Sequence, residues 1–158
     1  MTIRKLPLET NEEILTLLTL QTASYRVEAQ LIGFEDIPPL KDGIASIRSS
    51  TETFIGYFLD DDGVSTLAGV ISYSCDGSVV TICRMMVHPD YFRRGIASSL
   101  LQFVLAEQEE RGASRFVVST GAANYPAVEL YQSFGFAKRR TLTVGPGITL
   151  TVFERPAG

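Results

Sequence analysis

The sequence predicts an α/β or α+β fold, in which a mixed central sheet carries helices on both of its faces. Residues 54–87 hold three β-rich segments joined by two tight turns, and such hairpins make antiparallel strands. Residues 79–120 then read as strand, helix and strand, and a crossover helix implies two parallel strands joined with right-handed chirality. Together the two patterns predict strands of both directions in one sheet.

The N-terminal part of the chain has a mostly helical pattern. Thr10 followed by Glu13 fits a capping box, which marks the start of a helix. Apolar residues then recur at helical spacing until Pro38 and Pro39 interrupt the chain. The expected elements are a strand at 3–6, a helix with the apolar face 14–20, a second helix at 22–31 and a short helix at 40–48.

Strands and helices alternate in the rest of the chain. The acidic run 60–62 before Gly63 and the pair Asp76-Gly77 both indicate tight turns, and the acidic run lacks the spacing of a calcium loop. Gly135 and the run 145–147 mark further breaks. The expected elements are strands at 54–59, 64–73 and 79–87, a helix at 95–111, a strand at 115–120, a helix at 125–134, a strand at 136–144 and a last strand from 148.

Size and charge limit the class of protein. The 158 residues suit one domain spanning 1–158, with an N-terminal part at 1–52 and the sheet at 53–158. Fourteen Lys and Arg against 18 Asp and Glu give a net charge of −4, which argues against nucleic acid or anionic lipid as a partner. No membrane span or secretory signal is visible, so we expect a cytoplasmic protein.

The metal-binding residue types are scarce. One His and two Cys without metal-ligand spacing give no basis for a metal site, so we expect none. Cys75 and Cys83 lie in or beside β-like runs, and we expect both to be buried free thiols.

The segment 87–97 joins a strand to the start of a helix and suits a phosphate group. Unpaired N–H groups and the macrodipole make a helix N-terminus a ready anion site, and Gly95 lets the backbone approach closely. Arg93 and Arg94 add cationic donors suited to phosphate oxygens. The segment is neither a Walker loop nor GxGxxG. By itself it is equally consistent with a basic surface turn.

The same segment resembles the cofactor loop of the GCN5-related N-acetyltransferases, which has arginine or glutamine, two residues, glycine, one residue, then glycine or alanine. The run 87–90 and the run 93–97 match that loop and the strand end before it. Phe92 departs from it, because arginine or glutamine is usual at that position. In the family, the backbone N–H groups of this loop hold the pyrophosphate of acetyl-CoA.

A second block resembles another motif of that family, asparagine-x-x-alanine-x-x-leucine-tyrosine followed by glycine-phenylalanine. Asn124, Ala127 and Tyr131 match it, and Gly135-Phe136 completes it. The resemblance implies that the asparagine contacts the coenzyme A arm and that the tyrosine lies near the thioester sulfur. It also implies a mostly antiparallel sheet with a β-α-β acyl-CoA-binding core. The order of the expected elements also agrees with that of the family over roughly the whole chain.

The resemblance implies a co-substrate site for acetyl-CoA and a reaction in which an amine attacks the thioester directly. Tyr131 is the expected general acid, because a phenol can protonate a departing thiolate. Backbone N–H groups near the end of the fourth strand would hold the pantetheine. The implied cofactor-binding residues are Met85, Met86, Val87, Phe92, Arg93, Arg94, Gly95, Ile96, Ala97, Ser98, Asn124, Ala127 and Tyr131.

The general base is missing from the places where many family members carry it. Neither 79–86 nor 119–121, which correspond to the fourth and fifth strands, contains a carboxylate. The imidazole of His88 could accept a proton, but a loop role is expected for it. A water relay or a carboxylate from the N-terminal helices remains. That region is also the expected acceptor side, where Tyr25, Glu28 and Glu35 are candidate substrate residues.

Two functions from different classes stay open. The first is an acetyl-CoA-dependent N-acetyltransferase acting on a primary amine of a small molecule, peptide or protein. The second is a non-catalytic acyl-CoA-binding sensor or regulatory module. Either could act as a monomer or a homodimer.

Overall fold

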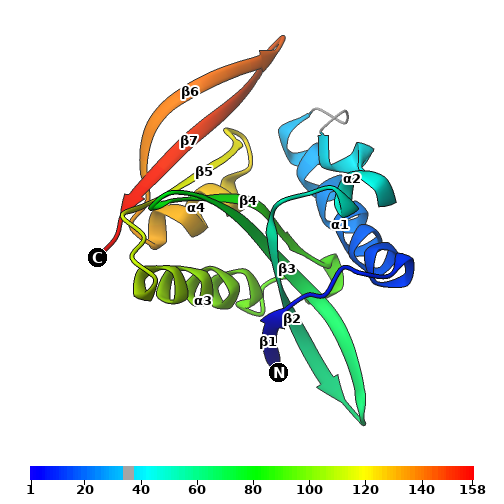
Figure 1. The fold of residues 1–158 in the computed structure, drawn as a ribbon. Helices are drawn as coiled ribbons and strands as arrows, with labels where there is room; N and C mark the ends of the chain where they lie inside the picture. Colours follow the sequence, from blue (N-terminus) through cyan, green and yellow to red (C-terminus); the bar gives the residue numbers. More distant parts are fainter. Residues whose placement is uncertain (34–37) are drawn as a thin grey trace.

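The computed structural model describes residues 1–33 and 38–158. The N-terminal part holds four elements, which cross from one edge of the sheet to one of its faces (Figure 1). They are β1 (Thr2–Lys5), the long helix α1 (Asn11–Ile32), the 3-10 turn η1 (Pro38–Lys41) and the short helix α2 (Ile44–Arg48).

The remaining elements complete a seven-stranded sheet in the order β1-β2-β3-β4-β5-β7-β6. All neighbouring strands are antiparallel except β4 and β5, which are parallel and joined through α3. The elements are β2 (Thr53–Asp61), β3 (Val64–Asp76), β4 (Val79–Val87), the 3-10 turn η2 (Pro89–Tyr91), α3 (Ile96–Glu110), β5 (Arg115–Gly121), α4 (Tyr125–Ser133), β6 (Ala137–Gly145) and β7 (Ile148–Pro156). The predicted mixed, mostly antiparallel sheet is confirmed.

Helices cover both faces of the sheet, as predicted, and each face has its own apolar core. One core packs α3 and α4 on the sheet around Leu100, Phe116 and Phe153. The other packs α1 and α2 on the opposite face around Ile14, Leu17 and Met86 (Figure 1). Successive side chains along β3 and β4 point to opposite faces of the sheet, so they pack alternately into the two cores.

The parallel pair β4 and β5 stays together over only part of its length. The two strands pair from Val79 to Ile82 on β4, and no described pairing joins the rest of β4 to β5. Cys83 is an extra residue on β4 opposite β3, so a bulge falls where the pairing ends. A bulge bends its strand and strengthens the local twist, which separates the ends of the two strands.

The structure corrects three expectations. Residues 11–32 form one helix instead of two, because no proline or glycine interrupts them; the capping box of Thr10 and Glu13 is confirmed. The short helix predicted at 40–48 covers only Ile44–Arg48. Cys75 and Cys83 are exposed, not buried, because Cys75 lies next to the β3–β4 turn and Cys83 is the extra residue of the β4 bulge. Among the described residues, no helix combines the length and apolarity needed to cross a membrane.

Candidate active site

The loop between β4 and α3 has a backbone shaped to receive an anion. Arg93 has φ of 64° and Gly95 has φ of 74°, both in the left-handed region. That conformation costs a non-glycine residue about 1–2 kcal/mol, and alternating handedness turns successive N–H groups toward one point. An added Cβ at Gly95 would meet no atom within 4 Å, so the backbone is open there. We call this turn, residues 93–95, the nest, because its backbone has the geometry that can bind an anion.

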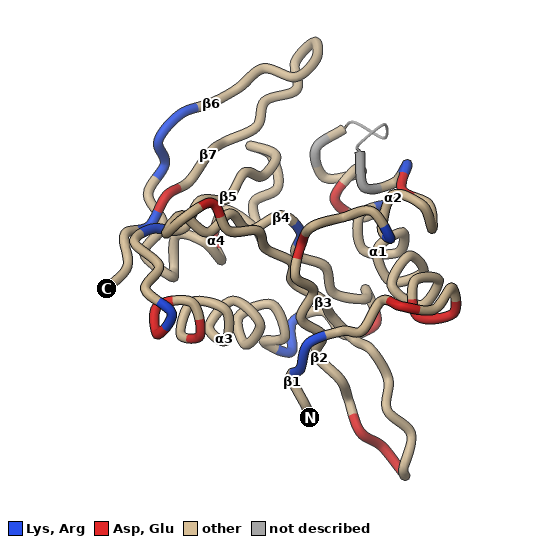
Figure 2. The backbone as a smooth tube through the Cα atoms, viewed as in Figure 1, with Lys and Arg blue, Asp and Glu red and all other residues tan. Residues whose placement is uncertain are grey.

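Helix α3 begins at this nest without a capping side chain. Gly95 is its N-cap, so within the described part of the chain no capping side chain satisfies the first N–H groups of the helix. Arg93 and Arg94 are exposed beside it, and the Arg94 guanidinium lies 5.3 Å from the centre of the Tyr91 ring. Figure 2 shows this basic stretch at the start of α3. The predicted residues Phe92, Arg93, Arg94, Gly95, Ile96, Ala97 and Ser98 therefore lie together in one loop and helix start.

The nest is fixed to the scaffold on both sides. His88 accepts a hydrogen bond from the Asp90 N–H at Nδ1 (3.1 Å) and caps η2, which confirms its predicted loop role. Behind the loop, a Cβ at Gly69 on β3 would approach Ile96 Cγ2 to 2.7 Å. Only glycine allows α3 to begin this close to the sheet. Phe92, by contrast, leaves 42% of its side chain exposed.

The end of β4 that is not paired with β5, residues 83–87, is covered by α1. The N–H of Met85 donates to Tyr25 Oη and the N–H of Val87 donates to Ser24 Oγ, both at 3.2 Å. These two N–H groups therefore have protein acceptors, whereas the family resemblance implies that backbone N–H groups here hold the pantetheine. The Met86 side chain points away into the core beneath α1.

Five polar side chains meet where β4 and β5 separate, and we call them the junction cluster: Tyr25, Glu28, Thr120, Asn124 and Tyr131. Asn124 caps α4 with Oδ1, which accepts from the Ala127 N–H (3.4 Å), so its Nδ2 is free to donate to Glu28 Oε1 (3.1 Å). Thr120, near the end of β5, is a second hydrogen-bond partner of Glu28. Burial raises the pKa of the Glu28 carboxyl, although both hydrogen bonds oppose the shift.

Tyr131, on α4, lies close to Glu28, which is on α1. Its side chain is only 3% exposed and packs edge-on against the Phe136 ring, with centroids 5.6 Å apart. Burial, and then the negative charge of Glu28, raise the pKa of the Tyr131 phenol. Burial and Glu28 act in the same direction on the pKa of Tyr25. Both phenols therefore stay protonated and able to donate at neutral pH.

A second polar group, the Arg84 cluster, lies farther along the same face and consists of Gln21, Asp42, Glu52, Ser72 and Arg84. Arg84 donates to Glu52 through Nε (2.9 Å) and to Asp42 through Nη1 (2.6 Å). Ser72, fully buried on β3, also donates to Glu52 (2.6 Å). Burial acts to raise the pKa of Asp42 and of Glu52, but hydrogen bonds and the Arg84 charge outweigh it and lower both. This cluster ties β2 and the η1–α2 segment to β4.

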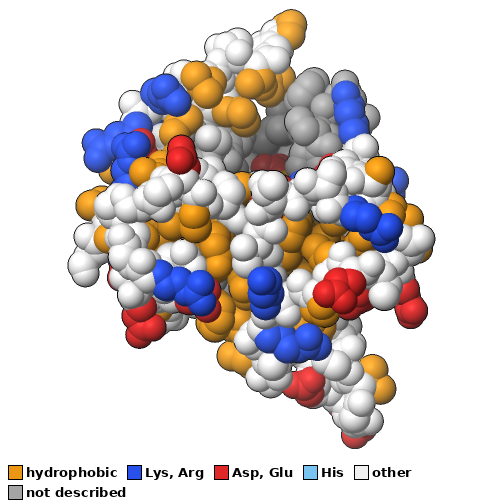
Figure 3. All heavy atoms as spheres, viewed as in Figure 1, with side chains coloured by type: hydrophobic (Ala, Val, Ile, Leu, Met, Phe, Trp, Pro, Cys, Tyr) orange, Lys and Arg blue, Asp and Glu red, His pale blue; other side chains and the backbone are white. Residues whose placement is uncertain are grey.

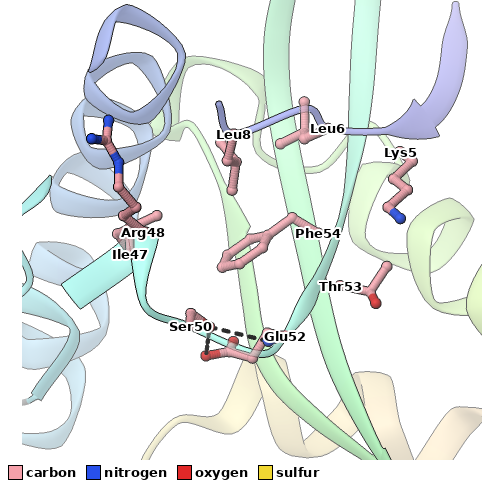
Figure 4. Close-up of a pocket in the computed structure, with 9 residues that line it drawn as sticks. All are labelled: Lys5, Leu6, Leu8, Ile47, Arg48, Ser50, Glu52, Thr53 and Phe54. Carbon is pink, nitrogen blue, oxygen red and sulfur yellow. Dashed lines mark hydrogen bonds between the residues drawn. The ribbon is translucent and has the colours of Figure 1, made fainter. Parts of the chain in front are cut away.

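A surface pocket lies away from the junction cluster, between the β1–α1 connection, α2 and the start of β2 (Figure 4). Lys5, Arg48 and Phe54 are among its lining residues, and Ser50 bonds to Glu52 within it. None of the motif residues reaches this pocket. Glu52 is its single link to the Arg84 cluster.

The structure shows which of the predicted residues lie close together and adds partners that the sequence did not indicate. The structure brings Tyr25, Glu28, Asn124 and Tyr131 together, whereas Glu35 lies outside the described residues. Ser24 and Thr120 are not part of either sequence motif. An alternation of polar residues on the inner face of 21–28 was the available signal for Ser24. Nothing in the sequence singled out Thr120.

These features define the class of the protein. The family model described as Acetyltransferase (GNAT) family matches residues 14–136. The chain therefore belongs to the GNAT family of acetyltransferases and is an acyltransferase.

Several named proteins are similar to it. UPF0157 protein YqkA of Bacillus subtilis is 42% identical over 138 residues, or 87% of this chain, but the match spans only 38% of YqkA. The bS18-alanine N-acetyltransferase of Escherichia coli is 28% identical over 114 residues, 72% of each chain, and its crystal structure has a TM-score of 0.75 over 99% of this chain and 93% of that one, at 19% identity. PaiA N-acetyltransferase of Thermoplasma acidophilum, solved with coenzyme A, gives a TM-score of 0.70 at 17% identity and 99% coverage of both chains, which shows the shared fold.

Proposed function

We propose that the protein is an acetyl-CoA-dependent N-acetyltransferase that moves the acetyl group to a primary amine by direct attack. The observation that carries this proposal is the position of the junction cluster at the point where β4 and β5 separate. A protonated phenol, a carboxylate and backbone donors meet there, and acyl transfer from a thioester to an amine needs such groups.

The anion nest supports binding of the co-substrate. Acetyl-CoA supplies a thioester and carries a pyrophosphate, and the nest offers backbone N–H groups, the α3 N-terminus and two exposed arginines. The local cations explain how a chain of net charge −4 could hold an anionic ligand. Ser24 and Tyr25 would have to release the β4 N–H groups for pantetheine to pair with that strand.

Tyr131 is the proposed general acid. Its buried phenol keeps its proton at neutral pH, because burial and the Glu28 charge both raise its pKa. As the bond between the acetyl carbon and sulfur breaks, that proton passes to the thiolate. Asn124 and Ala127 at the start of α4 lie in the same segment and would border the pantetheine arm.

A primary amine fits the electrostatics of the proposed acceptor side. Figure 3 shows the surface hollowed between the β6–β7 hairpin and the side that carries α1 and α2. Glu28 and Tyr25 on α1 belong to that side, and a carboxylate favours a cationic substrate. The E. coli relative is named for a protein alanine, which makes the α-amine of a peptide the first acceptor to test.

Release of free coenzyme A tests the function directly. The purified chain should release thiol from acetyl-CoA in the presence of a peptide beginning with Ala, spermidine, kanamycin or free amino acids. Tight acetyl-CoA binding with no acetylation of any of these acceptors would favour the non-catalytic binding module instead.

The Gly95→Glu variant tests the nest. A carboxylate at the α3 N-terminus repels the pyrophosphate, and φ of 74° strains any side chain there, so the acetyl-CoA Kd should rise about 10–100-fold by calorimetry. Glu110→Gln, at the other end of α3, is the matched control and should leave Kd unchanged. An unaltered Kd for Gly95→Glu would remove the loop from the binding site.

A further inference from the structure

Glu28 is the carboxylate of the junction cluster, which also contains the proposed general acid Tyr131. It lies one turn after Tyr25 on α1, so both side chains face the free ends of β4 and β5. It contacts α4 through Asn124 and β5 through Thr120. The strands themselves offer no alternative, since 83–87 and 119–121 contain no acidic residue.

The surroundings of Glu28 leave its charge uncompensated. The groups that face it are the phenol of Tyr25 on its own helix, the phenol of Tyr131 on α4, and the uncharged Asn124 and Thr120. No lysine, arginine or histidine of residues 1–33 and 38–158 forms an ion pair with it. Arg84 is engaged by Asp42 and Glu52.

A half-buried carboxylate without a cationic partner is costly to keep ionised, so a cationic ligand would be favoured beside it. Asn124 and Thr120 both form hydrogen bonds with the carboxyl group and fix its position. The Asn124 amide is itself fixed by capping α4, so it holds Glu28 in one orientation. The arrangement therefore suits a defined contact with an ammonium group.

We infer that Glu28 is the general base of this enzyme, which receives the acceptor ammonium and takes its first proton. The inference deepens the proposed function and rests on it. Loss of that proton to Glu28 leaves a neutral amine, whose lone pair forms the C–N bond to the acetyl carbon. The C–S bond then breaks, and its electron pair leaves on sulfur, which takes the Tyr131 proton. The second amine proton restores Tyr131, and Glu28 returns its proton to water.

Glu28→Gln is the decisive variant, because glutamine keeps the size of the side chain and an oxygen that can accept from Asn124. The value of kcat/KM should fall about 10²–10³-fold, measured with whichever of the four acceptors the wild type acetylates fastest. The acetyl-CoA Kd should stay within twofold. The acid limb of the kcat/KM–pH profile should disappear, which a merely structural role would not cause.

Two further variants complete the experiment. Glu12→Gln removes an exposed carboxylate from the same helix and should keep wild-type activity and pH profile. Glu28→Ala should regain activity when formate is added, because a small carboxylate can occupy the vacated space and accept the proton.

The outcomes separate the two claims. An active wild type with unchanged kcat/KM and pH profile in Glu28→Gln would overturn Glu28 as base and leave the proposed function standing. A large loss in Glu28→Gln with the acid limb intact and no formate rescue of Glu28→Ala would overturn it as well. A wild type that acetylates none of the acceptors would overturn the proposed function, and the role of Glu28 with it.

Discussion

The junction cluster and the Arg84 cluster both place carboxylates beside α1, yet their electrostatics are opposite. In the Arg84 cluster, Arg84 lies between Asp42 and Glu52, and both carboxyl groups have lowered pKa values. In the junction cluster, the described groups that face Glu28 are phenols and neutral polar groups, and its pKa is raised. Gln21 and Glu28 lie about two turns apart on one face of α1, so this face contributes to both clusters.

The difference separates a carboxylate that holds the fold from one that is available for chemistry. Paired carboxylates gain from ionisation in the folded state, whereas an unpaired half-buried carboxylate is destabilised by it. A carboxyl group whose pKa is raised by burial and that has no cationic partner is a candidate for a functional site. Mutations in the two clusters should therefore affect different measurements.

The largest expected effect is on turnover, from the Tyr131→Phe variant. Removal of the phenol hydroxyl takes away the proposed proton donor, so kcat should fall about 10²–10³-fold while the acetyl-CoA Kd stays within twofold. Steady-state thiol release and calorimetry measure the two quantities. Tyr125→Phe on the same helix, whose side chain is 68% exposed, is the control and should keep full activity. Unchanged kcat in Tyr131→Phe would remove Tyr131 as the acid.

The Arg84→Met variant should affect stability instead. It leaves Asp42 and Glu52 without their cation, and the free energy of unfolding should fall by about 2–3 kcal/mol. Urea denaturation at neutral pH measures this loss. Adding Asp42→Asn and Glu52→Gln to Arg84→Met should recover most of it, because no unpaired charge then remains. Arg140→Met, at an exposed position on β6, should change stability little.

The smallest effect concerns the pH dependence of stability in Glu28→Gln. The folded protein holds the Glu28 proton above its ordinary pKa of 4.5, so this group's contribution to stability falls as pH rises from there through the raised folded value. Glu28→Gln should therefore be more stable than wild type by about 0.5–1 kcal/mol at neutral pH.

That advantage should vanish as pH falls toward 4.5. Asp42 and Glu52 behave in the opposite way, because their lowered values add stability above the ordinary pKa and lose it as pH falls through the folded value. Denaturation of wild type and variant at several pH values separates the two contributions. A stability difference that is independent of pH would contradict the contrast between the clusters.

The sequence predicted local features well because local chemistry determines them. The hairpin at Asp76-Gly77, the capping box at Thr10 and the nest at Gly95 each depend on residues within a few positions. The break predicted within 11–32 was wrong, because an interruption of the apolar pattern is weaker evidence than a proline or glycine.

The partners inside the site depend on tertiary packing and were less predictable. Glu28 and Asn124 are 96 positions apart, and Tyr25 and Met85 are 60 apart. No local pattern reveals that the Met85 N–H would be covered by α1, since this depends on how the helix rests on the sheet. The motifs identified the strands and helices that form the site, and the fold selected which α1 side chains complete it.

The two ends of the strand order also bear on how copies of the chain meet. Both edge strands carry cations: Arg4 and Lys5 on β1, and the run 138–140 on β6, which is exposed along nearly its whole length (Figure 2). An open edge offers unpaired backbone groups to another strand, and like charges on approaching edges oppose that pairing. The basic run 138–140 thus opposes edge-to-edge pairing of a chain whose net charge is acidic.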